Sequence, residues 1–188
     1  MLRTDLPMAG FILALLLLGL LGVSRGSAQT DEDEAEVAAV IAKFKAKDPD
    51  LARVFASAAG YAVFPTVGKG GIGIGGARGG GRVYQGGRLI GRSTLTQVTI
   101  GLQLGGQAYS EVVFLKDQAS LDNFKRGRLK LDAQASAVAL TERAAADLAY
   151  REGVAIVTMA KGGLMYEASV GGQKFSFKPI GKDAGAAQ

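Results

Sequence analysis

The stretch YAVFPTVGKGGIGIGGARGGGRVY, residues 61–84, decides the fold of this chain. It contains nine glycines among 24 residues. Glycine buries no side chain and loses more conformational freedom on folding than any other residue, so this many glycines must serve the backbone. Three roles are open: a twisted or bulged strand, a close approach of another backbone or a ligand, and N–H groups aimed at an anion.

Two motif matches within this stretch are weak. Residues 71–76 match the motif G-x-G-x-x-G, but in a dinucleotide-binding site a helix follows this motif. Here the motif is followed by three more glycines and by residues 82–84, which favour a strand. Three glycines also recur every fourth residue, as in packed membrane helices, but charged residues interrupt that segment. The local pattern therefore favours a twisted, glycine-rich pair of strands.

Several motifs in order along the chain resemble the SYLF-domain family of lipid-binding proteins. The resemblance extends from Val37 to Phe177 and implies that the protein binds lipid. The motifs are GYAVFP (60–65), GKGGIGIGG (68–76), GGG (79–81), GLQLGGQ (101–107), VVF (112–114), KGGL (161–164) and SVGG (169–172).

The N-terminal residues 1–28 have the pattern of a secretory signal peptide. Arg3 precedes an apolar run at residues 11–23, and small residues at 26–28 offer a cleavage site. The run is shorter than the roughly 20 residues that a spanning helix needs, although an uncleaved anchor is the alternative. We expect cleavage near Ala28 and a periplasmic or secreted protein, with one domain at 29–178 and a flexible tail at 179–188.

The composition offers little chemistry for catalysis. The chain has no histidine and no cysteine, so the commonest metal ligands, the usual neutral-pH base and thiol nucleophiles are missing. We therefore expect a protein without catalytic activity, metal or cofactor. A hydrolase that uses two carboxylates ranks last among the functions considered, because the spacing of the acidic residues does not single out a catalytic pair. A net charge of +5 suits an anionic surface, but it is too small for a nucleic-acid binder.

Two helices are predicted before the glycine stretch. Val37, Val40, Ile41 and Phe44 form an apolar stripe within residues 32–47, and a similar stripe follows Pro49 until Gly60. These helices either cover a sheet, which we favour, or lie on a membrane. A basic amphipathic segment in this position binds phosphoinositides in eukaryotic relatives, whereas residues 31–34 of this chain are all acidic.

Short apolar runs separated by glycine pairs predict the rest of the fold. Strands are expected at 82–85, 88–90, 98–104, 109–115, 154–159, 164–170 and 173–177. Asp117 is expected to cap a short helix that turns Leu121 and Phe124 inward, and the family resemblance implies a strand at 135–140. The predicted fold is α+β: a twisted antiparallel or barrel-like sheet of glycine-linked strands, with the two N-terminal helices packed on it.

We expect an exported protein that recognises anionic phospholipid head groups or a membrane surface. The cations Lys69, Arg78 and Arg82, with the backbone of Gly71 and Gly73, form one candidate head-group site. A second candidate site is the basic run Lys125, Arg126, Arg128 and Lys130. The alternative is that these four residues only form a solvent-exposed charged face. The alternative function is a structural protein of the envelope that self-associates through glycine-rich edges. An actin partner is not expected, because the chain has a bacterial-looking signal peptide and lacks the attached domains of eukaryotic relatives.

Overall fold

The glycine-rich stretch forms two long paired strands in the computed structural model, β1 (Gly60–Ile72) and β2 (Ile74–Gln85). Their ladder runs from Tyr61 opposite Tyr84 to Ile72 opposite Ile74, with a bulge between Val63 and Thr66. The twisted strand pair is therefore confirmed. The structure describes residues 24–72, 74–100, 106–129, 131, 137–162 and 172–180.

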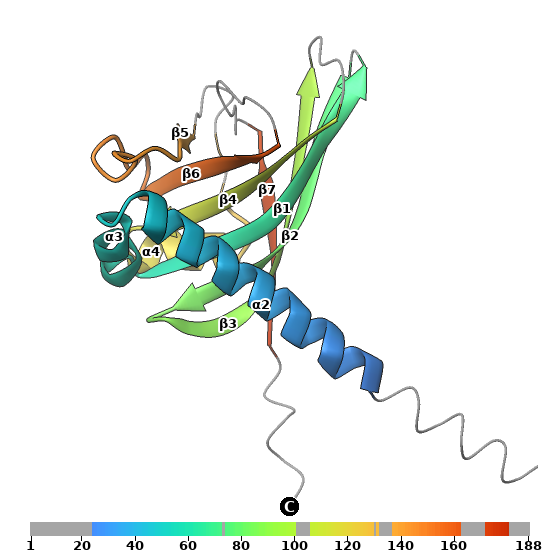
Figure 1. Cartoon of the computed structure of the whole chain (residues 1–188), viewed down its shortest axis with the longest axis horizontal. Coiled ribbons are helices and arrows are strands. Elements are labelled where there is room, and N and C mark those ends of the chain that lie inside the picture. The colour runs from blue at the N-terminus through green and yellow to red at the C-terminus, as the bar shows by residue number, and fades with distance from the viewer. Residues whose placement is uncertain are drawn as a thin grey trace, which may run out of the picture. The chain divides into compact units, whose positions relative to one another are not determined.

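These residues form an α+β fold with three helices and one seven-stranded sheet (Figure 1). The sheet order is β5-β6-β4-β1-β2-β3-β7, with all neighbours antiparallel except β5 and β6. The sheet is open, with β5 and β7 at its edges, and it does not close into a barrel. The remaining elements are α2 (Ser24–Lys47), α3 (Leu51–Ser57), β3 (Arg88–Ile100), β4 (Gln107–Leu115), α4 (Gln118–Lys125), β5 (Val138–Ala139), β6 (Val154–Lys161) and β7 (Lys174–Pro179).

Close contact between β1 and β2 explains part of the glycine content. A Cβ atom added at Gly81 would lie 2.6 Å from the carbonyl oxygen of Val63 and 2.6 Å from Cδ1 of Phe64. A Cβ atom at Gly79 would lie 2.8 Å from the carbonyl oxygen of Thr66. Real Cβ atoms do not approach other atoms this closely, so the strand pair requires glycine at both positions.

The chain divides into two compact units, residues 1–36 and 37–188, and the sheet belongs to the second. Within this unit, the end of α2 and α3 pack on one side of the sheet, which we call the helix face. Phe55 lies at the centre, with its ring 5.0 Å from that of Tyr61 and 4.8 Å from that of Phe114. The predicted stripe of Val37, Val40 and Phe44 is buried in the same cluster. The prediction that both helices cover the sheet is confirmed for this unit.

The other side of the sheet packs against α4, and we call it the α4 face. The rings of Phe124 and Phe175 lie 5.3 Å apart, and the rings of Phe64 and Phe175 lie 5.7 Å apart. Asp117 caps α4 as predicted, because its side chain accepts a hydrogen bond from the backbone N–H of Ser120 at 2.8 Å.

Some predicted elements differ from the structure. Helix α2 begins at Ser24, before the predicted start at residue 32. Strand β3 runs through to Ile100, whereas residues 101–104 of the predicted strand and the strand at 164–170 lie outside the described residues. Of the strand implied at 135–140, residues 135 and 136 lie outside the described residues, and Val138–Ala139 form β5. Strand β5 pairs parallel with β6, so the prediction of an all-antiparallel sheet was wrong. A loop of 14 residues, 140–153, lies between β5 and β6, which gives the chain room to return in the same direction.

Within the described residues, no helix combines the length and the apolar character needed to cross a membrane.

Candidate functional site

The three cations predicted around the glycine stretch lie on two different faces of the sheet. Lys69 pairs with Ala77, and Ala77 belongs to the core of the α4 face. Arg82 pairs with Val63, which belongs to the helix face, and Arg78 lies four residues from Arg82 on the same strand and face. Lys69 therefore cannot hold one phosphate together with Arg78 and Arg82.

The exposure of these residues separates them further. Arg82 is only 7% exposed and takes part in other interactions, whereas Arg78 is exposed and forms no ion pair with any described residue. Gly71 lies near the end of β1 with a φ of 154°, a backbone conformation that favours glycine. Gly73 lies outside the described residues. Of the predicted cations near the glycines, Arg78 is the accessible one on the helix face.

The predicted basic run follows α4. Lys125 ends the helix, Arg126 and Arg128 are exposed, and Lys130 lies outside the described residues. Arg126 donates a hydrogen bond to the side-chain oxygen of Asn123 at 3.1 Å. Because α4 packs on β7, the run is held near this edge of the sheet.

A row of residues crosses the helix face in register, and the sequence prediction had named only Arg78 among them as a site residue. Its charged members are Lys161, Arg78 and Lys174, and each stands on a different strand. From β6 to β7 the paired residues are Lys161, Ala108, Gly68, Arg78, Thr96 and Lys174. Paired residues point to the same side of a sheet, so these side chains share one surface.

A second row, two residues along each strand, has small side chains. Together the two rows on β1, β2, β3 and β7 form what we call the open face. Its members are Gly68, Arg78, Thr96, Lys174, Thr66, Gly80, Thr94 and Ser176. All are exposed except Thr94, which is half-buried. The open face therefore consists of two cations, four hydroxyl side chains and two glycines.

The glycines of the open face are not required by any contact with the part of the chain that the structure describes. A Cβ atom added at Gly68 or Gly80 would meet nothing within 4 Å, in contrast to the adjacent Gly79 and Gly81. Glycine in a strand costs about 0.5–1 kcal/mol relative to alanine. Since no internal contact requires glycine at these two positions, a surface that must approach the backbone closely from outside gives a physical reason for them.

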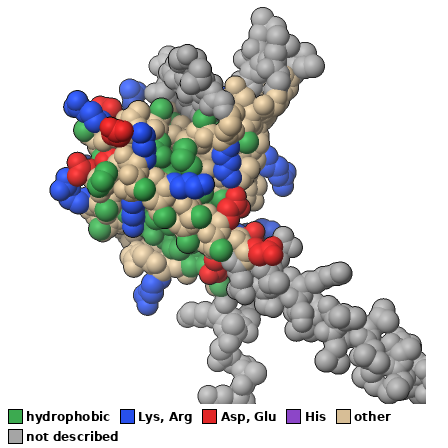
Figure 2. Space-filling view, in the orientation of Figure 1, with side chains coloured by type: hydrophobic (Ala, Val, Ile, Leu, Met, Phe, Trp, Pro, Cys, Tyr) green, Lys and Arg blue, Asp and Glu red, His purple; other side chains and the backbone are tan. Residues whose placement is uncertain are grey.

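The charged side chains of the strands are almost all basic. Among the strand residues, Glu111 is the one acidic side chain, and it is fully buried on the α4 face. In Figure 2 the projecting end of the strands shows mainly uncharged side chains and backbone. The open face therefore attracts anions without competition from carboxylates on the same strands.

Glu111 belongs to a buried polar cluster. Its Oε2 atom accepts a hydrogen bond from Nε2 of Gln173 at 3.0 Å, and the same Nε2 lies 3.5 Å from the hydroxyl of Tyr109. The Oε1 atom of Glu111 has no partner among the described residues. Burial raises the pKa of Glu111 to about 8, and the hydrogen bond from Gln173 opposes this rise. At neutral pH the folded protein therefore holds this carboxyl group mainly as the neutral acid.

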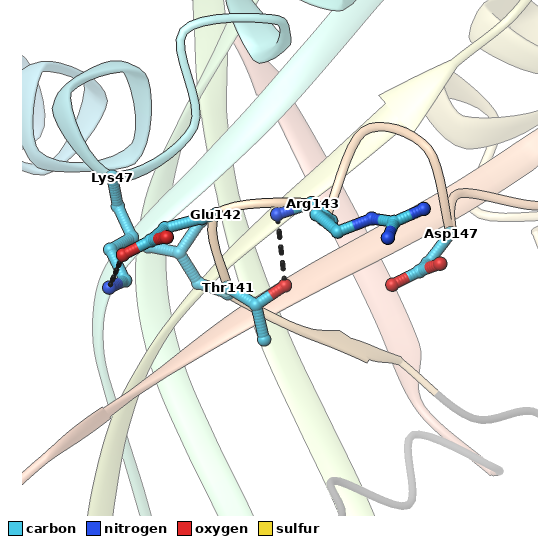
Figure 3. Close-up of a pocket in the computed structure, with 6 residues that line it drawn as sticks. Lys47, Thr141, Glu142, Arg143 and Asp147 are labelled. Atoms are coloured by element: carbon cyan, nitrogen blue, oxygen red, sulfur yellow. Dashed lines mark hydrogen bonds and ion pairs between the residues drawn. The ribbon is translucent and has the colours of Figure 1, made fainter.

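A groove of about 400 Å³ lies between the end of α2 and residues 140–147 (Figure 3). Nζ of Lys47 lies 3.1 Å from Oε1 of Glu142, and Arg143 and Asp147 line the same groove. Its charges are balanced in sign, and exposed ion pairs of this kind contribute little energy. The groove is thus a weaker candidate for an anion site than the open face.

Comparison with known proteins gives one family. Residues 96–179 match the family model of Ysc84, described as a Las17-binding protein actin regulator. No curated protein matches the chain. The matched segment includes Thr96, Lys161 and Lys174, which belong to the row across the helix face, but it does not include β1 and β2. The match confirms the resemblance to the SYLF family seen in the sequence over residues 96–179, which are 84 of the 188 residues.

Proposed function

We propose that this protein binds anionic phospholipid head groups at a membrane surface and catalyses no reaction. The open face is the observation that carries the proposal: Arg78 and Lys174 are exposed there, and none of its described residues is acidic. The family gives the general class, lipid binding, and the open face supplies the preference for anionic head groups.

The geometry of the open face suits phosphate groups. Arg78 and Lys174 are separated by one strand, β3, so their backbones lie roughly 10 Å apart. An arginine binds phosphate with two parallel hydrogen bonds, and a lysine adds a point charge. The hydroxyl groups of Thr96, Thr94 and Ser176 lie around them and can donate to further phosphate or glycerol oxygens.

The proposed membrane surface faces the periplasm or the cell exterior. The basis is the signal-peptide pattern of residues 1–28. The matching family is described by Las17 binding and actin regulation, but an exported protein would not meet actin, so lipid is the partner that we propose. The absence of histidine and cysteine from the chain supports a binding role.

The test is flotation of the processed chain, residues 29–188 by the predicted cleavage, with neutral or anionic vesicles. Each cation near an anionic surface contributes about 1 kcal/mol, so R78Q/K174Q should weaken binding by about thirtyfold. The control K43Q/R143Q removes the same charge from exposed positions outside the open face and should weaken binding much less. Binding to anionic vesicles should also fall as added salt shortens the Debye length from about 30 Å at 0.01 M to about 3 Å at 1 M.

Equal binding to neutral and anionic vesicles, or equal losses in the two double variants, would refute the proposal. Absence of flotation together with concentration-dependent association in sedimentation would favour the alternative of an envelope protein that self-associates.

A further inference from the structure

Three strands extend beyond the open face as a separate projection. Strand β4 pairs with β1 only as far as Lys69, and β7 pairs with β3 only as far as Thr96. Beyond these positions, β1, β2 and β3 continue as a narrow three-stranded tip, which projects from the body of the sheet (Figure 1). We define the tip as residues 70–72, 74–76 and 97–100.

The tip carries no charged residue, and all its large side chains except Gln97 and Thr99 are apolar. Its ten residues are four glycines, the polar Gln97 and Thr99, isoleucines at positions 72, 74 and 100, and Val98. Val98 is 74% exposed, which is unusual for a large hydrophobic side chain in this protein. It stands two residues beyond Thr96 and therefore on the same side of the sheet as the open face.

We propose that this tip enters the interfacial region of an anionic bilayer while Arg78 and Lys174 bind the phosphates. The inference rests on the proposed function and adds the part of the protein that contacts the apolar layer. Charge complementarity selects the occupant, because the cations stand directly at the base of an uncharged, apolar tip. A membrane surface presents these two layers in the same order.

The dimensions agree with this placement. Strands rise about 3.3 Å per residue, so Val98 stands about 7 Å beyond Thr96 and Ile74 about 13 Å beyond Arg78. The polar region of one leaflet is about 5–8 Å thick, from the difference between the whole bilayer and its hydrocarbon core. When the cations meet the phosphates, Val98 therefore reaches the boundary of the hydrocarbon layer.

The depth of insertion follows from the same dimensions. Interfacial segments bury an apolar face about 5–10 Å into the boundary between head groups and acyl chains. Val98 stands two residues beyond Thr96, a distance of this size, so the inference places the tip in the interfacial layer.

A tryptophan reporter tests the insertion, since the chain contains no tryptophan. The processed chain carrying Val98→Trp is mixed with anionic vesicles that contain lipids brominated on the acyl chains. We expect a blue shift of the emission and strong quenching. The matched control is Ser57→Trp, at an exposed position at the end of α3, which should show neither effect.

A second variant measures the energetic contribution of the tip. Val98→Asp places a charge at an exposed position and should leave folding intact, as circular dichroism will check. It should weaken binding to anionic vesicles at least about tenfold, because a charge in the interfacial layer is unfavourable. The control Ser57→Asp should lose much less.

The outcomes separate the two proposals. If the protein floats with anionic vesicles while the Val98→Trp reporter remains unquenched, tip insertion is wrong and head-group binding stands. If the protein does not float, the proposed function fails, and the inference fails with it. A blue shift without vesicles that grows with protein concentration would show that a second copy of the chain covers the tip, and it would also overturn the inference.

Discussion

Replacement of the buried Glu111 by glutamine should change how stability depends on pH. Below about pH 4.5 the carboxyl is protonated in both the folded and the unfolded chain. As the pH rises further, only the unfolded chain ionises, because burial raises the pKa of Glu111 to about 8 in the fold. The free energy of unfolding should therefore fall by about 1.4 kcal/mol per pH unit over this window, a loss on the order of 3 kcal/mol by pH 7.

Glu111→Gln removes the ionisation and keeps an oxygen that can accept the hydrogen bond from Gln173. Urea unfolding of both proteins at pH 5, 6, 7 and 8 measures the difference. We expect nearly equal stability at pH 5 and an advantage for the variant that grows toward pH 8. Parallel pH curves would refute the argument that burial of this carboxyl costs stability.

Two further predictions concern the glycines and the loop at residues 141–147. Gly81→Ala should destabilise the protein by about 1–3 kcal/mol, because the added methyl group overpacks against β1. Gly80→Ala should leave stability unchanged or raise it slightly, but it should weaken vesicle binding. Urea unfolding and flotation measure both variants, and equal losses of stability in the two would contradict the prediction. Asp48 accepts hydrogen bonds from the backbone N–H groups of Ala145 at 2.7 Å and Asp50 at 3.0 Å. Asp48→Ala should therefore cost about 1–3 kcal/mol and speed proteolysis within residues 141–147, and an unchanged cleavage rate would exclude this anchoring role.

The local elements could be predicted because their causes are local. The spacing of Val37, Val40 and Phe44 predicted a buried helix stripe, and Asp117 predicted a helix cap. The pair Gly86 and Gly87 indicated a turn between two strands, and their φ values in the structure are 55° and 75°. Each of these signals depends on neighbours within a few residues in the chain.

The open face could not be predicted in the same way. Its cations stand on separate strands, and their alignment depends on strand order and register. The bulge between Val63 and Thr66 changes which residues of β1 share a face, so simple alternation could not show that Lys69 and Arg78 lie on opposite sides. The burial of Glu111 had a usable signal, since it alternates with Tyr109, Val113 and Leu115, which all point toward the core.

The measurement that tests the open face most directly compares two variants of equal net charge in binding to anionic vesicles at low salt. R78Q/K174Q removes the cations of the open face, and R126Q/R128Q removes the exposed part of the basic run after α4. We predict a loss of about thirtyfold for the first and of less than about threefold for the second. The reverse order would place the membrane contact at the basic run and would contradict the assignment of head-group binding to the open face.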